Sequence, residues 1–152
     1  MQLPDLLRSI AAELSAVPDE ALAVYHAGRG VGPLRSSPRF VPVGHAWRLG
    51  MFLLDADARL YLTGEVTRAV EPGIALLSRS PSAEQRRDYR AAAARGKFAP
   101  GRVINFNYRV LDGVEEPLFL DGDTVRVHLD TGGTAPLETY LRERVSLLLG
   151  ES

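Results

Sequence analysis

The residues that could carry acid–base or hydrolytic chemistry in this chain are three histidines and a few carboxylates and amides. A histidine beside a carboxylate or a serine can act as a general base. The candidate catalytic residues are therefore His45, Glu65 and His128, with two asparagines, Asn105 and Asn107, completing the polar set. The chain has no cysteine, which excludes thiolate catalysis, disulfides and cysteine-bound zinc. The histidines show no HxH or HxxxH spacing, and we expect no metal and no cofactor.

Motifs that resemble nucleotide, calcium or serine-hydrolase sites fail on their spacing. The glycines between Gly28 and Gly32 follow a predicted helix instead of a strand, so they do not match a dinucleotide-binding loop. Asp55 and Asp57 begin a calcium-loop spacing, but an arginine and a valine occupy later ligand positions. No GxSxG or Ser-x-x-Lys motif is present. These segments are predicted to be turns.

Polar side chains alternate with apolar ones on two predicted strands, and this alternation is typical of a sheet with one solvated face. The polar positions are Thr63, Glu65 and Thr67 on one strand and Asn105, Asn107 and Arg109 on the other. If the strands are neighbours, the same face could form a pocket for an amino-acid-like ligand. The sequence leaves both interpretations open, a solvated sheet face and a ligand pocket. If the face forms a pocket, Asn105, Asn107 and Arg109 are its ligand-binding residues.

Charge is segregated along the chain. Arg79–Arg102 contains seven basic and two acidic residues, whereas Val103 and the residues after it contain four basic and nine acidic ones. Arg86 and Arg90 share one helix face with Arg87 beside them, and arginine can bind phosphate or carboxylate with two hydrogen bonds. Three interpretations stay open: a solvated arginine-rich helix, pairing with the acidic C-terminal third within or between chains, and a site for an anionic ligand.

The elements that would position these residues include four predicted helices. Apolar residues at helical spacing predict one from Leu3 to Leu14 and a short one from Pro18 to just before Gly28. A third, arginine-rich helix begins near Pro81 and ends at Gly96. The last begins near Pro136 and ends at Gly150.

The predicted strands lie between these helices. Trp47–Leu54 is apolar on nearly both faces and is typical of a buried strand, and Arg59–Val70 and Ile104–Val110 alternate as strands do. Residues 118–129 predict a hairpin that turns at Asp121-Gly122. Because helices and strands do not alternate regularly, we expect an α+β fold with a mainly antiparallel, twisted sheet.

Length and composition indicate one globular domain. The chain has 152 residues, of which 45% are hydrophobic and 24% are charged, and its net charge is -1. We therefore predict a single domain over residues 1–152, with no membrane span and no nucleic-acid partner. The lack of cysteine and of a basic leader with an apolar segment predicts a cytoplasmic protein.

Three segments of the chain carry a recognisable pattern: Phe40–Gly50, Leu54–Arg68 with its Tyr-x-Thr-Gly-Glu-Val-Thr-Arg ending, and Pro136–Val145. Together they resemble a small uncharacterised family of actinobacterial proteins, some of which are labelled glutaminase. The resemblance implies an amidohydrolase acting on glutamine, but it assigns no catalytic residue, and the Ser-x-x-Lys pair of serine-dependent glutaminases is missing.

The functional prediction from the sequence is a non-catalytic binding or interaction protein that can form a homo-oligomer. Its partner would be a small anionic or amino-acid-like ligand, or a macromolecule. The alternatives are a small amidohydrolase and a phosphate-binding protein acting through Arg79–Arg102.

Overall fold

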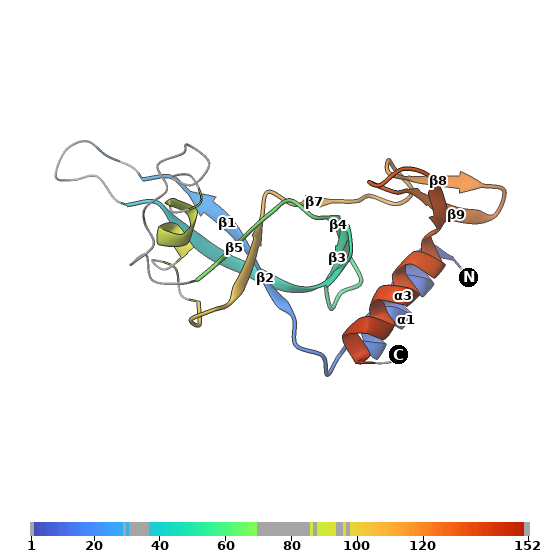
Figure 1. Cartoon of the computed structure of the whole chain (residues 1–152), viewed down its shortest axis with the longest axis horizontal. Coiled ribbons are helices and arrows are strands. Elements are labelled where there is room, and N and C mark those ends of the chain that lie inside the picture. The colour runs from blue at the N-terminus through green and yellow to red at the C-terminus, as the bar shows by residue number, and fades with distance from the viewer. Residues whose placement is uncertain are drawn as a thin grey trace. The chain divides into compact units, whose positions relative to one another are not determined.

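The structure is a computed structural model that describes residues 2–28, 30, 37–69, 86, 88–93, 96 and 98–150. The chain forms two compact units (Figure 1). Unit 1 comprises Met1–Asp19, Ala46–Thr63 and Tyr108–Ser152, and unit 2 comprises Glu20–His45 and Gly64–Asn107. Helices and mainly antiparallel strands give an α+β fold, which confirms the predicted class. That all 152 residues behave as one domain stays a prediction.

The two helices of unit 1 agree with the prediction. Helix α1 spans Leu3–Glu13 and has a proline in its first turn, where the missing N–H costs no helical hydrogen bond. Helix α3 spans Leu137–Leu149. It ends at Gly150, whose φ of 77° is the left-handed conformation that glycine adopts without strain.

Unit 1 also contains two antiparallel sets of strands. One has the order β2-β3-β4-β7, formed by the last residues of β2 (Arg39–Leu49), β3 (Phe52–Leu54), β4 (Leu60–Leu62) and β7 (Arg109–Val110). The other has the order β10-β9-β8, formed by β10 (Thr134–Pro136), β9 (Thr124–His128) and β8 (Leu118–Asp121). Its β8–β9 hairpin confirms the predicted one, and Gly122 in the turn has a φ of 62°.

The prediction of one continuous strand over Trp47–Leu54 is wrong. The chain reverses at Gly50 and Met51, so that Trp47 on β2 pairs with Leu54 on β3. Gly50 has a φ of 67°, which favours glycine. An added Cβ there would collide with Tyr140 and Arg144 of α3. Because Trp47 and Leu49 at the end of β2 are buried, as are all three residues of β3, these positions read as one apolar run.

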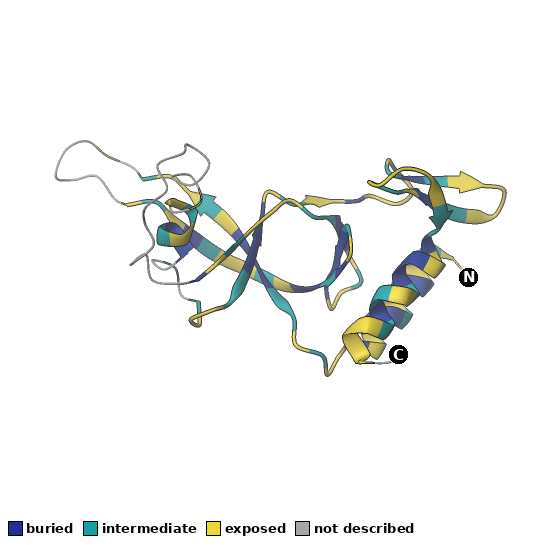
Figure 2. Cartoon of the chain, in the orientation of Figure 1, coloured by how far each residue is buried: buried dark blue, intermediate teal, exposed yellow. Residues whose placement is uncertain are grey.

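The core of unit 1 joins both helices to both sets of strands. Leu6, Ile10 and Leu14 from the α1 segment pack with side chains of α3, β3 and β9 in one buried cluster. Figure 2 shows these buried residues along the two helices, with exposed residues on their other sides. Two hydrogen bonds fix polar groups here. The Trp47 indole N–H donates to the Val17 carbonyl at 2.9 Å, and the Tyr140 hydroxyl accepts from the Met51 amide at 2.9 Å.

The turn between β3 and β4 is held by the buried carboxylate of Asp55. Its Oδ1 accepts the backbone N–H groups of Asp57 and Arg59, both at 2.9 Å. Its Oδ2 accepts the Tyr61 hydroxyl at 2.7 Å, and the Tyr61 ring packs edge-on against Tyr108 at 5.3 Å between ring centres. Asp55 and Asp57 therefore lie in a turn, as predicted, and the hydrogen bonds of Asp55 hold that turn together.

Unit 2 contains four strands in the order β5-β6-β1-β2. They are β5 (Glu65–Arg68), β6 (Val103–Phe106), β1 (Glu20–His26) and the first residues of β2. β5 and β6 are antiparallel, whereas β1 and β6 are parallel. Residue 86 and residues 88–93 are helical, in agreement with the predicted arginine-rich helix.

The helix predicted to start at Pro18 is wrong, since Glu20–His26 forms strand β1. Leu22 and Tyr25 fit a helical spacing as well as a strand, and a window this short does not separate the two. Pairing with β6 satisfies the backbone of β1, and this long-range contact overrides the helical preference of its alanines.

Two other predicted strands are each divided in two. The first, predicted from Arg59, is divided into β4 and β5 with Gly64 between them. The second, over residues 104–110, is divided into β6 and β7 with a break at Asn107. Asn107 has a φ of 55°, a conformation that asparagine tolerates better than most residues. Gly64 lies so close to the Asn107 carbonyl that a Cβ would collide with it.

The core of unit 2 is rich in aromatic rings and alanine. Phe40 lies at the centre, with ring centres at 5.1 Å from Tyr25, 6.1 Å from Tyr89 and 4.6 Å from Phe106. Ala92 and Ala93 of the helical segment are buried against the same cluster. The small alanines let the helix approach this aromatic core closely.

Candidate functional site

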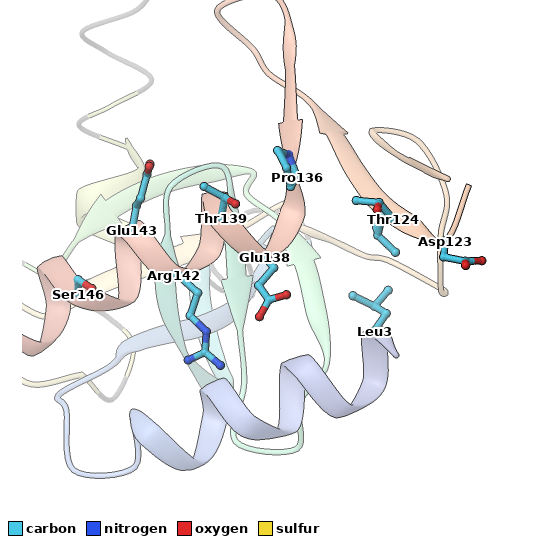
Figure 3. Close-up of a pocket in the computed structure, with 10 residues that line it drawn as sticks. Leu3, Asp123, Thr124, Pro136, Glu138, Thr139, Arg142, Glu143 and Ser146 are labelled. Carbon is cyan, nitrogen blue, oxygen red and sulfur yellow. The ribbon is translucent and has the colours of Figure 1, made fainter. Parts of the chain in front are cut away.

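In the part of the chain that the structure describes, a groove of about 570 Å³ lies in unit 1. This volume lies within the range of about 300–1,000 Å³ that is usual for small-molecule sites. Figure 3 shows α3, the start of α1 and the β8–β9 hairpin around it. The groove is lined by Leu3, Asp123, Thr124, Val125, Pro136, Glu138, Thr139, Arg142, Glu143 and Ser146.

Helix α3 supplies half of the lining because its two sides have different compositions. Four residues on one side, Leu137, Tyr140, Leu141 and Val145, are buried in the core of unit 1. The groove residues of α3 follow one another at the spacing of a helix face, at positions 138, 139, 142, 143 and 146. The amphipathic pattern that anchors the helix therefore also presents a polar surface to the groove.

The charge of the groove is mainly negative. Arg142 is its one basic residue and forms an ion pair with Glu13 of α1. Glu143 pairs with Arg144 at 3.5 Å, and its side chain is 70% exposed. Asp123 and Glu138 form no ion pair with any residue that the structure describes. Within the described residues, these two carboxylates therefore have no ion-pair partner.

Figure 3 shows how the charged side chains leave α3. Glu138 and Arg142 project toward α1, and Leu3 points from α1 toward Glu138. Thr139 and Glu143 project from another side of the helix. The Arg142–Glu13 ion pair therefore connects the two helices at one part of the groove, while Glu138 faces the start of α1.

The structure brings together two of the polar residues predicted in unit 2. The Asn107 amide donates to the Glu65 carboxylate at 2.5 Å, and both residues are exposed. The left-handed conformation of Asn107 and the close approach of Gly64 bring this part of the chain to the start of β5. Among the described residues, neither Glu65 nor Asn107 forms a hydrogen bond with a histidine or a serine.

Asn105 has a different environment from Asn107. Its side chain is fully buried and donates to Glu20 at 2.9 Å and to the Ala21 carbonyl at 3.2 Å. The register of β5 and β6 places Glu65 opposite Phe106 and Val66 opposite Asn105. Since directly opposed residues share a sheet face, Asn105 and Glu65 lie on opposite faces.

The candidate histidines are exposed on two strands. In β2, His45 Nδ1 lies 3.0 Å from the Arg102 guanidinium. In β9, the His128 ring stacks on Phe119 with centres 4.3 Å apart. His45 belongs to unit 2 and His128 to unit 1. Among the described residues, no group of three or more histidines and carboxylates could hold a metal ion.

The predicted arginine sites are only partly described. Arg86 and Arg90 are exposed on helical residues, whereas Arg87 lies outside the described residues. Most residues between 79 and 87 also lie outside the described part of the chain. An anion site in this segment therefore stays a prediction. Arg109 belongs to unit 1, where it forms an ion pair with Glu115 and donates to the Glu116 carbonyl at 3.0 Å.

Shifted pKa values occur around the Asp55 turn. Burial, together with the hydrogen bond to Asp55, raises the pKa of Tyr61 to about 12. Burial also raises the pKa of Tyr108, and the Asp55 carboxylate raises the pKa of Arg59. Each shift follows from packing in the turn, so these groups hold the structure and do not identify an active site.

The groove residues were not among those singled out from the sequence. They come from α1, β9, β10, α3 and the β8–β9 turn, and no short motif contains them. The available signal was a row of polar residues on one side of the last predicted helix. The acidic excess after Val103 was a second signal, since Asp123, Glu138 and Glu143 belong to it.

Comparison of the chain with protein-family models, with curated proteins and with solved structures gave no match. The resemblance to proteins labelled glutaminase therefore stays a prediction. In the part of the chain that the structure describes, no helix has both the length and the apolar character needed to cross a bilayer.

Proposed function

We propose that this chain is a non-catalytic binding protein that holds a small ligand in the groove of unit 1. The observation that carries the proposal is the hollow of about 570 Å³ whose lining combines apolar, hydroxyl and charged side chains. Sites for small molecules typically combine an apolar surface with a few polar groups that fix orientation.

The walls of the groove favour binding over chemistry. α1 and α3 share one buried core, so the groove is built on packed elements and does not depend on a loop alone. Its lining contains hydroxyls and carboxylates but no histidine, lysine or tyrosine. A serine or threonine hydroxyl needs an adjacent base to become a nucleophile, and carboxylates without such a partner act mainly as hydrogen-bond acceptors.

The test is a crystallographic screen of the full chain with a mixed set of neutral, acidic and basic small fragments. We expect fragments to occupy the groove of unit 1. A Thr139→Trp variant, which fills the groove, should lose them, and a Thr131→Trp variant at an exposed position outside the lining should keep them. Fragments that avoid the groove in the unmodified protein would contradict the proposal.

The proposal also predicts the result of an activity assay. Purified protein should release no ammonia from L-glutamine above the level of buffer. Turnover that disappears in a Glu65→Gln variant would contradict the non-catalytic role and would support the amidohydrolase instead.

A further inference from the structure

The geometry points to an organic cation as the ligand: we infer that the groove of unit 1 binds an ammonium or guanidinium group attached to a short apolar chain. This inference rests on the proposed function, and it specifies the chemistry of the ligand. It concerns a different part of the chain from the anion site predicted at Arg79–Arg102, which stays a prediction.

The first argument is the balance of charge in the lining. Three of the four ionisable residues that line the groove are acidic. The fourth, Arg142, is already paired with Glu13, so its charge is compensated by α1. An anion binding at Arg142 would have to displace Glu13 and lie near Glu138, and like charges at close range repel. A cation meets Glu138, which faces α1 and has no ion-pair partner among the described residues.

The second argument is the position of the apolar residues. Leu3 points from α1 toward Glu138, and Val125 and Pro136 belong to the same lining. A methylene chain can pack on such residues while its charged end remains at a carboxylate. Thr124 and Thr139 add hydroxyl oxygens that can accept further N–H bonds. The lining therefore suits a cation that carries several donors and an aliphatic stem.

The exposure of the carboxylates sets the expected strength. Glu138 is exposed, so its ion pair with a ligand is partly screened by water. Removing one such charge is expected to weaken binding by about two- to fivefold. Binding should also weaken between low ionic strength and about 0.15 M salt, where charges are screened over about 8 Å.

The experiment uses the full chain and agmatine, a four-carbon chain with an ammonium at one end and a guanidinium at the other. Nuclear magnetic resonance titration follows the backbone amides of the groove. Glutarate, a dicarboxylate of similar length, is the probe of opposite charge. We expect agmatine to change the chemical shifts of the groove amides. The Glu138→Gln variant should bind agmatine more weakly. The control variant, Asp112→Asn, changes an exposed acid outside the lining and should bind it unchanged.

The outcomes separate the two proposals. Binding of agmatine that Glu138→Gln weakens and Asp112→Asn does not supports the inference. Preference for glutarate, or equal loss in both variants, overturns it. If fragments occupy the groove in the crystallographic screen but agmatine does not bind, only the inference about the cation fails. If nothing occupies the groove, the proposed function fails as well.

Discussion

Replacing Tyr61 by phenylalanine removes a single hydroxyl from the turn between β3 and β4 and leaves the ring in place. That hydroxyl donates to Asp55 Oδ2 at 2.7 Å, and both side chains are buried. A hydrogen bond to a charged group contributes about 1.5–3 kcal/mol to stability. The variant should therefore lower the free energy of unfolding by about 1.5–3 kcal/mol at neutral pH, less where water reaches the vacated site.

The matched control is Tyr108→Phe. Tyr108 packs edge-on against Tyr61, so both substitutions remove a phenolic hydroxyl from the same pair of rings. Tyr108 shares no hydrogen bond with Asp55, and a change of about 0.5 kcal/mol or less is expected. Urea unfolding followed by circular dichroism measures both variants. Equal stability losses in the two would refute the role assigned to the Asp55–Tyr61 hydrogen bond.

The same pair predicts how stability depends on pH. Burial and the Asp55 hydrogen bond raise the pKa of Tyr61 to about 12 from its ordinary value of 10, because they favour the neutral phenol in the folded state. The stability from this group is fully present below about pH 10 and is lost as the pH rises toward 12. The difference between Tyr61→Phe and the unmodified protein should therefore shrink over this interval. A difference that stays constant up to pH 12 would contradict the argument.

Two further substitutions test close packing and a single hydrogen bond. Gly64→Ala places a Cβ against the Asn107 carbonyl and should destabilise the protein by about 1–3 kcal/mol in urea unfolding, whereas Gly44→Ala, which has room for a Cβ, should change stability little. Trp47→Phe removes the indole N–H bonded to the Val17 carbonyl together with part of a buried ring, and it should cost at least about 1–3 kcal/mol by the same measurement. Stability equal to that of the unmodified protein would contradict either prediction.

The parts of the fold that the sequence predicted well have local causes. In the first and last helices, apolar residues recur at helical spacing over several turns. A proline marks the start of the first helix, and a glycine marks the end of the last. The hairpin around Gly122 has a turn pair between two alternating strands. In each case the signal lies within the segment itself.

The errors occurred where distant contacts decide the structure. Strand β1 is fixed by a parallel partner more than 80 residues later, which no local pattern reveals. The breaks at Gly50, Gly64 and Asn107 lie within apolar or alternating runs that resemble continuous strands. Single glycines can occur inside strands, so only the three-dimensional packing around them shows that the chain turns there.

The candidate site was harder to predict than the fold, for a related reason. Sequence alternation placed Glu65 and Asn105 together in one proposed pocket, but the register separates them on opposite faces. The groove is formed by the packing of elements near both ends of the chain, and its residues are ordinary surface types. Only after α3 lies beside the start of α1 do Glu138 and Leu3 line the same space.

The shared core of α1 and α3 has a consequence for biosynthesis. Leu6 and Ile10 of α1 pack in the same cluster as Leu141 and Val145 of α3, which lie more than 130 residues further along the chain. During translation, the apolar side of α1 therefore lacks its α3 partner until those later residues have been made. Such a long-range contact favours slow folding and leaves an apolar helix face exposed in the incomplete chain.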